Sequence, residues 1–450
     1  MTTTAPLVSL QAPKDVSLDD IEGELRAIWQ QNNISEEGIN ATRASTFTLV
    51  IYEPEPIQAL LSALGFYTGP IDGISGGRTT AAIKAAQKAY GLAETGYSSV
   101  DFTQKLREEV IKERESGIKS LYHAIDLAPD MAGAAIADAI ALANPCRIVT
   151  ISPTTESDEG VKVQVSAYCP VQKSASSTLV CCEYITLRGT TDALERIGGL
   201  ITELVIPELP KFLWWKASPE PDFALFQRLA NQSRAIIVDS SNFIHPAEDL
   251  LEVSKMIDAG MPIADLNWLR LASWLELTAQ AFDPIERRPM IKEVDQVIVD
   301  YERGNLSQAL MYLGWLASRL QWQAVSFKHE GGDYDLIKIT FKSELKENIE
   351  AELAAIPLGE PGEILGDLIS LRLGSSNTEA DCTTVLCSST RGCMRMEAGG
   401  GAQSGYIQQV SSMADQKTEK LIGQQLQRSS GDLLYNETLK VVQEILSLRY

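Results

Sequence analysis

The chain has 450 residues, of which 44% are hydrophobic and 22% charged, ordinary values for a globular protein with two or three domains. The formal net charge of −21 argues against a nucleic-acid binder, because such proteins need clustered lysine and arginine to displace counterions. An acidic surface favours instead a protein partner with a basic face.

The N-terminus carries no targeting signal that the sequence reveals. Residues 1–16 have neither a basic segment nor a continuous apolar core, and we expect a disordered leader there. No run of about 18 apolar residues occurs, so we expect no membrane span. Seven cysteines, an odd number, suit a reducing compartment, and we predict a cytoplasmic protein.

An N-terminal α/β domain is predicted over 17–52 and 120–245. Its first helix carries an apolar stripe at helical spacing, Ile21, Leu25, Ile28 and Trp29. Strands alternate with helices beyond it, which indicates an at least partly parallel sheet. The expected strands are 46–52, 146–153, 162–169, 179–188, 211–216 and 234–240, and the expected helices are 126–142 and 190–204.

A small helical insert is predicted over 53–119. Glu53-Pro54-Glu55-Pro56 separates it from the strand before it, and two helices follow, 57–67 and 78–90, ending at Gly65 and Gly91. The stretches LGFYTGPIDG and GGRTTAAIKAAQKAYGL resemble the peptidoglycan-binding-like domain. A charged, solvated helix over 102–119 would connect this module back to the main body. The module either binds cell wall or, more simply, has been reused for protein contact. Its expected small core is Leu60, Leu64, Ile71, Ile74, Ile83, Ala86 and Tyr90.

The C-terminal domain, 246–450, is predicted to be α+β. Its expected helices are 247–259, 265–282, 306–320, 343–354 with Ser343 as N-cap, 419–428 and 437–448. Its expected strands are 294–301, 322–328, 334–342, 364–373, 383–387 and 406–411. The fold class is therefore two mixed-sheet domains with packed helices, plus the all-helical insert.

No catalytic, cofactor or metal site is predicted. The histidines are His123, His245 and His329, and none lies in a metal-binding motif. There is no nucleophile elbow and no phosphate-binding loop, and the carboxylates are scattered. An enzyme of sugar-phosphate metabolism remains a further hypothesis without a site to support it.

Adjacent tryptophans occur in the strand at 211–216. Trp214 and Trp215 should point to opposite faces of that strand. One would then be core, and the other is a candidate for partner contact.

The cysteines separate into two groups. Cys146, Cys169, Cys181 and Cys182 lie on predicted strands among apolar residues, where a thiol behaves as a small hydrophobe. Cys181 and Cys182 are adjacent, so they are poorly placed to bond each other. The second group lies at 381–397.

This second group, Cys382, Cys387 and Cys393, forms a C-x4-C-x5-C array. A loop sequence joins Cys387 to Cys393, and closing it would be worth about 2 to 3 kcal/mol. Arg391 and Arg395 flank Cys393 and should favour its reactive thiolate. We predict a reversible Cys387–Cys393 disulfide with Cys382 as alternative partner. Three unpaired thiols, or a zinc site lacking an evident fourth ligand, are the rival interpretations.

Five segments outside the insert resemble the glucose-6-phosphate dehydrogenase assembly protein family, OpcA, in its cyanobacterial form with this insert. They are ATRASTFTLV (41–50), NPCRIV (144–149), LPKFLWW (209–215), IVDS (237–240) and DLNWLR (265–270). The resemblance implies a non-enzymatic activator that binds glucose-6-phosphate dehydrogenase, aids formation of its active oligomer and raises its affinity for glucose 6-phosphate. It also implies modulation through thioredoxin, with reduction in the light lowering activation.

Overall fold

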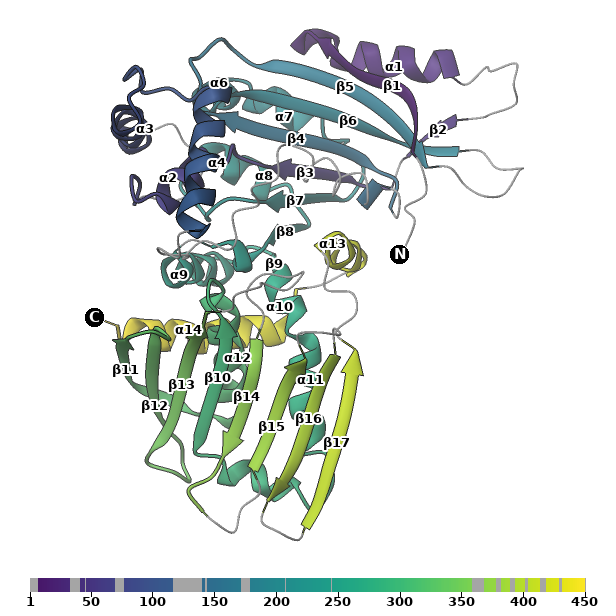
Figure 1. Ribbon diagram of the computed structural model, residues 1–450. Helices are drawn as coiled ribbons and strands as arrows, with labels where there is room; N and C mark the ends of the chain where they lie inside the picture. The colour runs from purple at the N-terminus through teal and green to yellow at the C-terminus, as the bar shows by residue number, and fades with distance from the viewer. Residues whose placement is uncertain are drawn as a thin grey trace.

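Two sheets, one above the other in Figure 1 and joined by helices, make up most of the computed structural model. The structure describes residues 7–32, 41–44, 46–68, 77–115, 140–141, 144–170, 179–206, 208–243, 245–357, 368–377, 382–388, 393–400, 404–412, 418–428 and 431–449. Most of the helix predicted at 126–142 lies outside these residues.

The first sheet has nine strands, six of them parallel in the order β6-β4-β3-β7-β8-β9. All five residues of β3 are buried, as expected of a parallel strand with both faces covered. β5 and β1 extend the sheet antiparallel beyond β6, and β2 pairs with β6. The strands are β1 (Leu7–Val16), β2 (Ala41–Arg43), β3 (Thr48–Tyr52), β4 (Arg147–Thr154), β5 (Lys162–Pro170), β6 (Leu179–Thr190), β7 (Lys211–Trp215), β8 (Ala235–Val238) and β9 (Ile263–Asp265).

The helices of this half follow the apolar periodicity of the sequence. In α1 the side chains of Ile21, Leu25 and Ile28 are buried against the sheet. Thr190 caps α6, because its hydroxyl accepts a hydrogen bond from the Ala193 amide at 3.2 Å. The helices are α1 (Ile21–Asn32), α6 (Thr191–Arg196), α7 (Gly198–Glu203), α8 (Ala224–Ala230) and α9 (Pro246–Asp258).

The insert forms α2 (Ile57–Ala63), α3 (Gly77–Ala89) and α4 (Val100–Glu115), with a hydrophobic core of its own. Leu60, Ile83 and Ala86 are buried as predicted, whereas Ile71 and Ile74 lie outside the described residues. The helix after the module was expected to be solvated, and this expectation was wrong. α4 buries one side in the module core, through Phe102, Leu106 and Val110.

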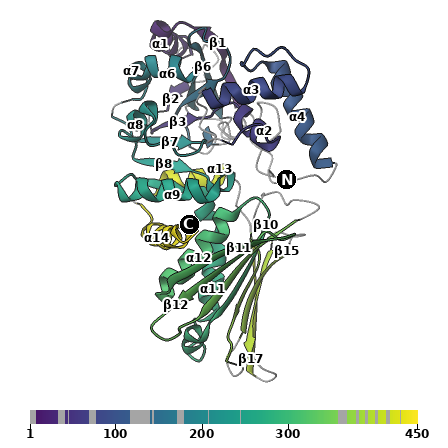
Figure 2. The ribbon, with the colours of Figure 1, turned by 90° about the vertical axis from the view of Figure 1, so that its left-hand side faces the viewer.

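The second sheet has eight strands in the order β11-β12-β13-β10-β14-β15-β16-β17. Among the described strands of this sheet, β10 and β13 pair in parallel and the other neighbours pair antiparallel. Figure 2 shows helices on one side of this sheet. The strands are β10 (Gln296–Glu302), β11 (Gln323–Gly331), β12 (Leu336–Lys342), β13 (Ile349–Ile356), β14 (Leu368–Gly374), β15 (Cys382–Ser388), β16 (Cys393–Gly400) and β17 (Ser404–Ser412). The helices are α10 (Leu266–Arg270), α11 (Ala272–Ala281), α12 (Leu306–Leu320), α13 (Thr418–Gln427) and α14 (Leu433–Ser447).

The predicted fold class is confirmed, but the prediction of a disordered N-terminal leader was wrong. Residues 7–16, expected to be disordered, form strand β1, which pairs with β5 from Leu7↔Pro170 to Val16↔Val163. A chain segment without a helical apolar pattern can join a sheet as its edge strand, because the partner strand satisfies its backbone groups.

The prediction of a helix at 343–354 was also wrong. Ile349, Ala351 and Leu353 are buried while Glu350 is exposed, a period of two that forms strand β13. Ser343 caps a turn instead of a helix, since its hydroxyl accepts from the amides of Leu345 and Lys346 at 3.3 and 3.1 Å. Residues Cys393–Gly400, for which no strand was predicted, form β16.

Candidate functional site

The carboxyl ends of the parallel strands are where an open α/β sheet ordinarily binds a ligand, at the point where the strand order reverses. Here that point is β3, because β4 lies on one side of it and β7 on the other. The order of the six parallel strands is that of dinucleotide-binding domains. The residues after β3 therefore decide whether a dinucleotide fits.

Carboxylates follow β3 at this edge. Glu53 forms an ion pair with Lys216, and Glu55 accepts a hydrogen bond from Arg188 at 2.6 Å. Burial raises the pKa of Glu55, although Arg188 opposes the rise. A pyrophosphate needs backbone amides of a glycine-rich turn at a helix start. The residues after β3 are Glu53-Pro54-Glu55-Pro56, in which the prolines have no amide to donate and the carboxylates occupy the cations Lys216 and Arg188, so this edge does not fit a dinucleotide.

The insert is seated on the same edge. Figure 1 shows α2 and α4 beside the ends toward which the arrows of β3 and β4 point. Ser98, between α3 and α4, donates its amide to the Thr155 carbonyl at 3.2 Å, and the two hydroxyls lie 2.6 Å apart. These contacts, with the Glu55–Arg188 ion pair, fix the module on the first sheet.

Neither tryptophan predicted as a contact candidate is available to a partner. Trp214 and Trp215 are 3% and 1% exposed, so the assignment of one of them to a partner surface was wrong. The physical reason is that β7 lies inside the sheet, between β3 and β8, where both faces are covered. Trp215 stacks on Tyr52 with ring centroids 3.7 Å apart, and Lys216 lies over Trp214.

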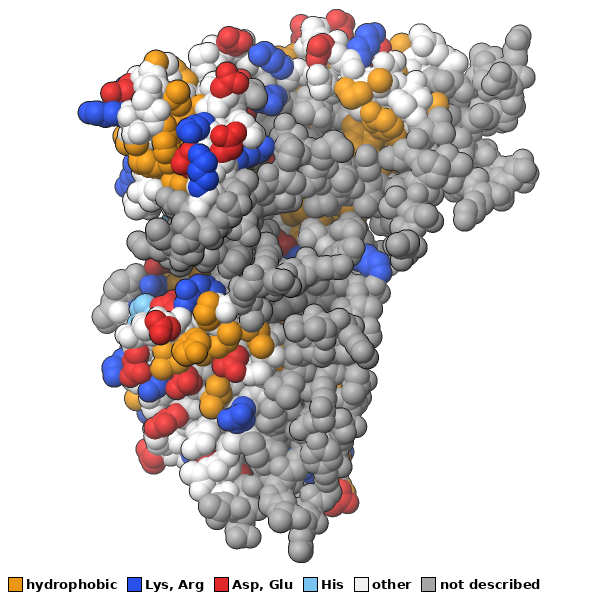
Figure 3. Space-filling model, viewed as in Figure 1, with side chains coloured by type: hydrophobic (Ala, Val, Ile, Leu, Met, Phe, Trp, Pro, Cys, Tyr) orange, Lys and Arg blue, Asp and Glu red, His pale blue; other side chains and the backbone are white. Residues whose placement is uncertain are grey.

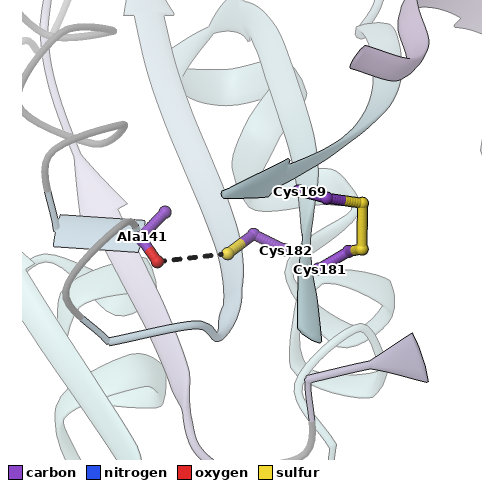
Figure 4. Close-up of a disulfide and its surroundings, with 4 residues drawn as sticks. All are labelled: Ala141, Cys169, Cys181 and Cys182. Carbon is purple, nitrogen blue, oxygen red and sulfur yellow. Dashed lines mark hydrogen bonds between the residues drawn. A yellow bond between two sulfur atoms is a disulfide. The ribbon is translucent and has the colours of Figure 1, made fainter. Parts of the chain in front are cut away.

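A disulfide joins Cys169 of β5 to Cys181 of β6, with an S–S distance of 2.02 Å (Figure 4). The expectation that these were thiols behaving as small hydrophobes was wrong. The antiparallel ladder pairs Tyr168 with Cys182, which brings Cys169 opposite Cys181. Leu10 and Trp29 pack against the bridge from the side of β1 and α1.

Cys182 points to the other face of the sheet from Cys181, and neither Cys182 nor the nearby Cys146 is disulfide-bonded. Cys146 and Cys182 are both buried, as predicted. Burial raises the pKa of the Cys146 thiol well above its usual value, and the nearby Cys182 adds to the rise. In Figure 4 the Cys182 thiol donates to the Ala141 carbonyl at 3.5 Å. Buried and with a raised pKa, the Cys146 thiol is a poor nucleophile.

The C-terminal cysteines occupy two adjacent strands. Cys387 of β15 pairs with Met394 of β16, Ser388 pairs with Cys393, and Cys382 pairs with Gly399. Directly paired residues of neighbouring strands point to the same face of the sheet. Cys387 and Cys393 are not directly paired, because the register between them is shifted by one residue. The side chains of all three cysteines lie outside the described residues, so the predicted Cys387–Cys393 bond stays a prediction.

A buried polar cluster joins the two halves of the molecule. Arg270 holds Asp239 at two points, at 2.7 and 2.8 Å, and both side chains are nearly inaccessible. Burial alone would raise the pKa of Asp239, but the Arg270 guanidinium outweighs it and holds the pKa below its usual value. Arg270 also donates to Thr418 at the start of α13, at 3.2 Å.

Asp265, at the end of β9, is the second carboxylate of this cluster. It accepts from the amides of Ser240 and Asn267 at 3.0 and 2.9 Å, and from the Tyr435 hydroxyl at 3.3 Å. Burial raises the pKa of Asp265 to about 6. Sequence reasoning missed this cluster, although the segment DLNWLR at 265–270 contains two of its charged members.

A cavity of about 250 Å³ lies beside the cluster, between the edge strand β9 and the C-terminal helices. The Trp268 indole, on its wall, donates to Asp432 at 2.9 Å. The charged side chains lining it carry both signs in equal number, so the cavity selects no charge class of ligand. Its polar and charged lining includes Arg234, Asp265, Gln425, Arg428, Asp432 and Tyr435.

Two further searches bear on function. Within the described residues no group of three or more histidine, cysteine or carboxylate side chains is arranged to hold a metal ion. Among the described helices, none combines the length and the apolar character needed to cross a bilayer.

Comparison with family models gives three matches. Residues 137–255 match the glucose-6-phosphate dehydrogenase subunit N-terminal domain, and residues 261–439 match the corresponding C-terminal domain. Residues 53–106 match a peptidoglycan binding domain.

Curated relatives align over nearly the whole chain. The chain is 58% identical to an OxPP cycle protein OpcA of Synechocystis sp., covering 99% of this chain and 95% of that protein. It is 55% identical to the protein of the same name from Nostoc punctiforme, covering 99% and 96%. A third, from Synechococcus elongatus, is 48% identical over 100% of this chain and 99% of its own.

Solved structures are more distant. The 3-ketoreductase KijD10 of Actinomadura kijaniata, in complex with NADP, is 12% identical, covers 57% of this chain and 83% of its own, and has a TM-score of 0.35. The UDP-N-acetylglucosamine 3-dehydrogenase GnnA of Acidithiobacillus ferrooxidans is 10% identical, covers 57% and 86%, and has a TM-score of 0.34. Likeness at this level is too weak to say anything of function.

Proposed function

The chain belongs to the OpcA family of glucose-6-phosphate dehydrogenase assembly proteins, and on that premise we propose that it is a non-enzymatic activator of glucose-6-phosphate dehydrogenase. It binds the dehydrogenase, aids formation of its active oligomer and raises its affinity for glucose 6-phosphate. The observation that carries this proposal is the match to both family domains across the two sheets.

The chemistry of the first sheet supports a binding role over catalysis. The edge where an α/β domain ordinarily holds its ligand carries Glu53 and Glu55 and is covered by the insert. Trp215 and Tyr52 stack in the core just behind that edge. A surface built in this way presents a protein face rather than a substrate crevice.

Activation follows from unequal affinity for two states of the dehydrogenase. A protein that binds the competent state more tightly shifts the enzyme toward that state by the ratio of its two affinities. A preference of about 1.4 kcal/mol gives roughly a tenfold shift. The coupling is reciprocal, so glucose 6-phosphate should also tighten the complex.

Steady-state kinetics test the proposal. We expect the purified protein to lower the concentration of glucose 6-phosphate at which the dehydrogenase reaches half its maximal rate. The purified protein without dehydrogenase should show no activity. An equal amount of an unrelated acidic protein is the control for charge. If the dehydrogenase saturates identically with and without the chain, in both redox states, the proposal is wrong.

Thiol redox state modulates this activity in our proposal. Thioredoxin dithiol would reduce the Cys387–Cys393 disulfide, or a disulfide that uses Cys382, leaving two thiols on the chain and the disulfide on thioredoxin. Reduction would weaken activation and oxidation would restore it. The Cys169–Cys181 disulfide is the other disulfide to test, and since both of its cysteines are fully buried, exchange there requires local opening of the sheet edge.

Paired variants separate the two disulfides. We expect Cys387→Ser/Cys393→Ser to activate equally before and after treatment with reduced thioredoxin, whereas Cys169→Ser/Cys181→Ser still responds. The reverse outcome assigns the response to the β5–β6 disulfide. A response retained in both double variants excludes both pairs as the switch.

Binding to cell wall is the alternative function, favoured by the match of residues 53–106 to a peptidoglycan binding domain. Sedimentation with purified peptidoglycan tests it. Recovery of the chain in the pellet, and its loss when residues of the insert are changed, would support wall binding. If the chain stays in the supernatant, this alternative is removed.

A further inference from the structure

One face of the second sheet is bare over the described residues. Figure 2 shows α11 and α12 on the opposite side of this sheet. Side chains that point to the helices are buried, such as Ile337, Ile339 and Phe341 of β12. Those that point the other way, such as Lys338 and Lys342, are exposed.

The charges on this face are balanced, unlike those of the chain. The whole chain has 60 acidic and 39 basic side chains. Among the described side chains of this face that reach solvent, as many are basic as acidic, so the exposed part of the face lacks the excess negative charge that would repel a second copy. They are Lys328, Lys338, Lys342 and Arg372, and Asp300, Glu330, Glu350 and Glu352. Glu302, which the register also places on this face, is buried.

An apolar group interrupts the charges. Ile298 of β10 lies in one cross-strand row with Glu352 and Arg372. Ile369 lies at an irregularity of the β10–β14 register, where it and Ser370 together stand opposite Asp300. Ile298 and Ile369 are only half-buried, and neither belongs to the hydrophobic cluster that fills the core. Figure 3 views this face and shows hydrophobic atoms among red and blue side chains. An apolar centre within a charged rim is the anatomy of a protein interface.

We propose that this face binds the same face of a second copy, as a two-fold dimer in which the sheets pack on each other. The axis runs along the strands between β10 and β14, the two middle strands of the sheet. β10 of one copy then faces β14 of the other. Asp300 lies diagonally opposite Arg372 of the second copy, within reach of its long side chain, and this pair occurs twice. Ile298 and Ile369 of both copies meet near the axis.

Two observations favour a second copy over another partner. Arg372 is exposed and makes no ion pair within the described part of the chain, so its charge is available across the axis. Eight strands spaced about 4.8 Å apart and about seven residues long cover roughly 900 Å². A standard stable interface buries about 800 Å² on each partner. The dimer does not depend on the proposed activation of the dehydrogenase.

Mass measurement tests the dimer. We expect light scattering on the full chain at tens of micromolar to give twice the monomer mass, and Ile298→Asp to give the monomer. Ile285→Asp is the matched control, since Ile285 is 73% exposed and lies outside this sheet. Circular dichroism checks that each variant is folded. The proposal is wrong if the wild type is a monomer, even one that binds the dehydrogenase through this face. It is also wrong if Ile298→Asp remains a dimer.

Charge exchange tests the axis. Asp300→Arg sets two arginines together across the axis, and Arg372→Asp sets two aspartates together, so each variant alone should be monomeric. Mixed in equal amounts, the two variants should form a dimer, because one copy then carries arginine at both positions 300 and 372 and the other carries aspartate at both. Each of the two cross-axis pairs again joins an arginine to an aspartate. If the mixture stays monomeric while each variant is folded, this arrangement of the two copies is wrong.

Discussion

Asp249 lies in the first turn of α9 with 7% of its surface exposed, and it is a carboxyl group that the fold holds in an unfavourable setting. Burial raises its pKa to about 7, and the nearby Glu248 and Glu220 add to the rise. The Ser218 hydroxyl, 3.3 Å away, opposes it by donating to the carboxylate. The folded state therefore prefers the protonated form near neutral pH.

Replacing this carboxyl should change how stability depends on pH. The folded pKa lies above the unfolded one, so Asp249 contributes stability that is full below about pH 4 and is lost as pH rises through about 7. The free energy of unfolding of Asp249→Asn should therefore increase relative to that of the wild type as the pH rises from 4 to 7, by at most roughly 1.4 kcal/mol per pH unit. Urea unfolding at pH 5 and 8 measures this gain. Asp258→Asn, at the exposed end of α9, is the control, and a gain at Asp249 that does not vary with pH would contradict the assignment.

The cysteines show which residue properties follow from sequence. Burial of Cys146, Cys169, Cys181 and Cys182 follows from their apolar neighbours in strands, and it is confirmed. The Cys169–Cys181 bond was missed because it depends on the register of β5 against β6, which joins residues 12 apart. Local composition gives the face of a strand but not its partner residue.

Gly314 decides how two helices pack at the scale of elements. It lies in α12 with no room for a side chain, because a Cβ there would meet the Val442 methyl at 2.7 Å and the Thr438 carbonyl at 3.0 Å. Both contacts belong to α14, the last helix of the chain. The close approach of α12 and α14 therefore depends on this glycine.

A pair of glycine substitutions tests that dependence. Gly314→Ala should lower the free energy of unfolding by about 1 to 3 kcal/mol through overpacking, although alanine is the better helix former. Gly23→Ala, in α1 with nothing within 4 Å of the added Cβ, should raise it by up to about 1 kcal/mol. Urea unfolding of both variants measures the two changes. Effects of the same sign would contradict the packing argument.

Two element predictions failed for one reason. Residues 343–354 are rich in glutamate and alanine, which favour helix, yet the burial of alternate residues makes 349–356 a strand. Residues 7–16 have little apolar periodicity, yet β5 offers them an open edge. In both cases a neighbouring strand supplied hydrogen bonds that local propensity does not include.

At the scale of the whole molecule, an α/β sheet with the strand order of a dinucleotide-binding domain carries an insert on its ligand edge. The insert enters after β3 and is anchored by Glu55, Arg188, Ser98 and Thr155. The C-terminal helices return to the first half, where Tyr435 reaches Asp265. The two sheets consequently share one continuous hydrophobic core, whereas the insert has its own.

This arrangement predicts that nicotinamide dinucleotides do not bind. About 1 mM NADPH should leave the melting temperature unchanged, because Glu53 and Glu55 stand where the phosphates would bind. A site with a dissociation constant near 10 μM would instead stabilise the fold by about 2.7 kcal/mol. The dehydrogenase, measured in parallel, is the positive control, and a clear upward shift for the chain would contradict the prediction.

The sequence by itself determined the fold class, the helical insert and the burial of the strand cysteines, because periodicity and turn residues act over a few positions. The family could be inferred from short segments of sequence, and the full-length relatives confirm it. The tertiary structure decided the Cys169–Cys181 bond, the burial of both Trp214 and Trp215, and the buried Asp239–Arg270 pair. Each of these depends on which strand or helix lies alongside another, and the pairing of distant segments is fixed only when the whole chain packs.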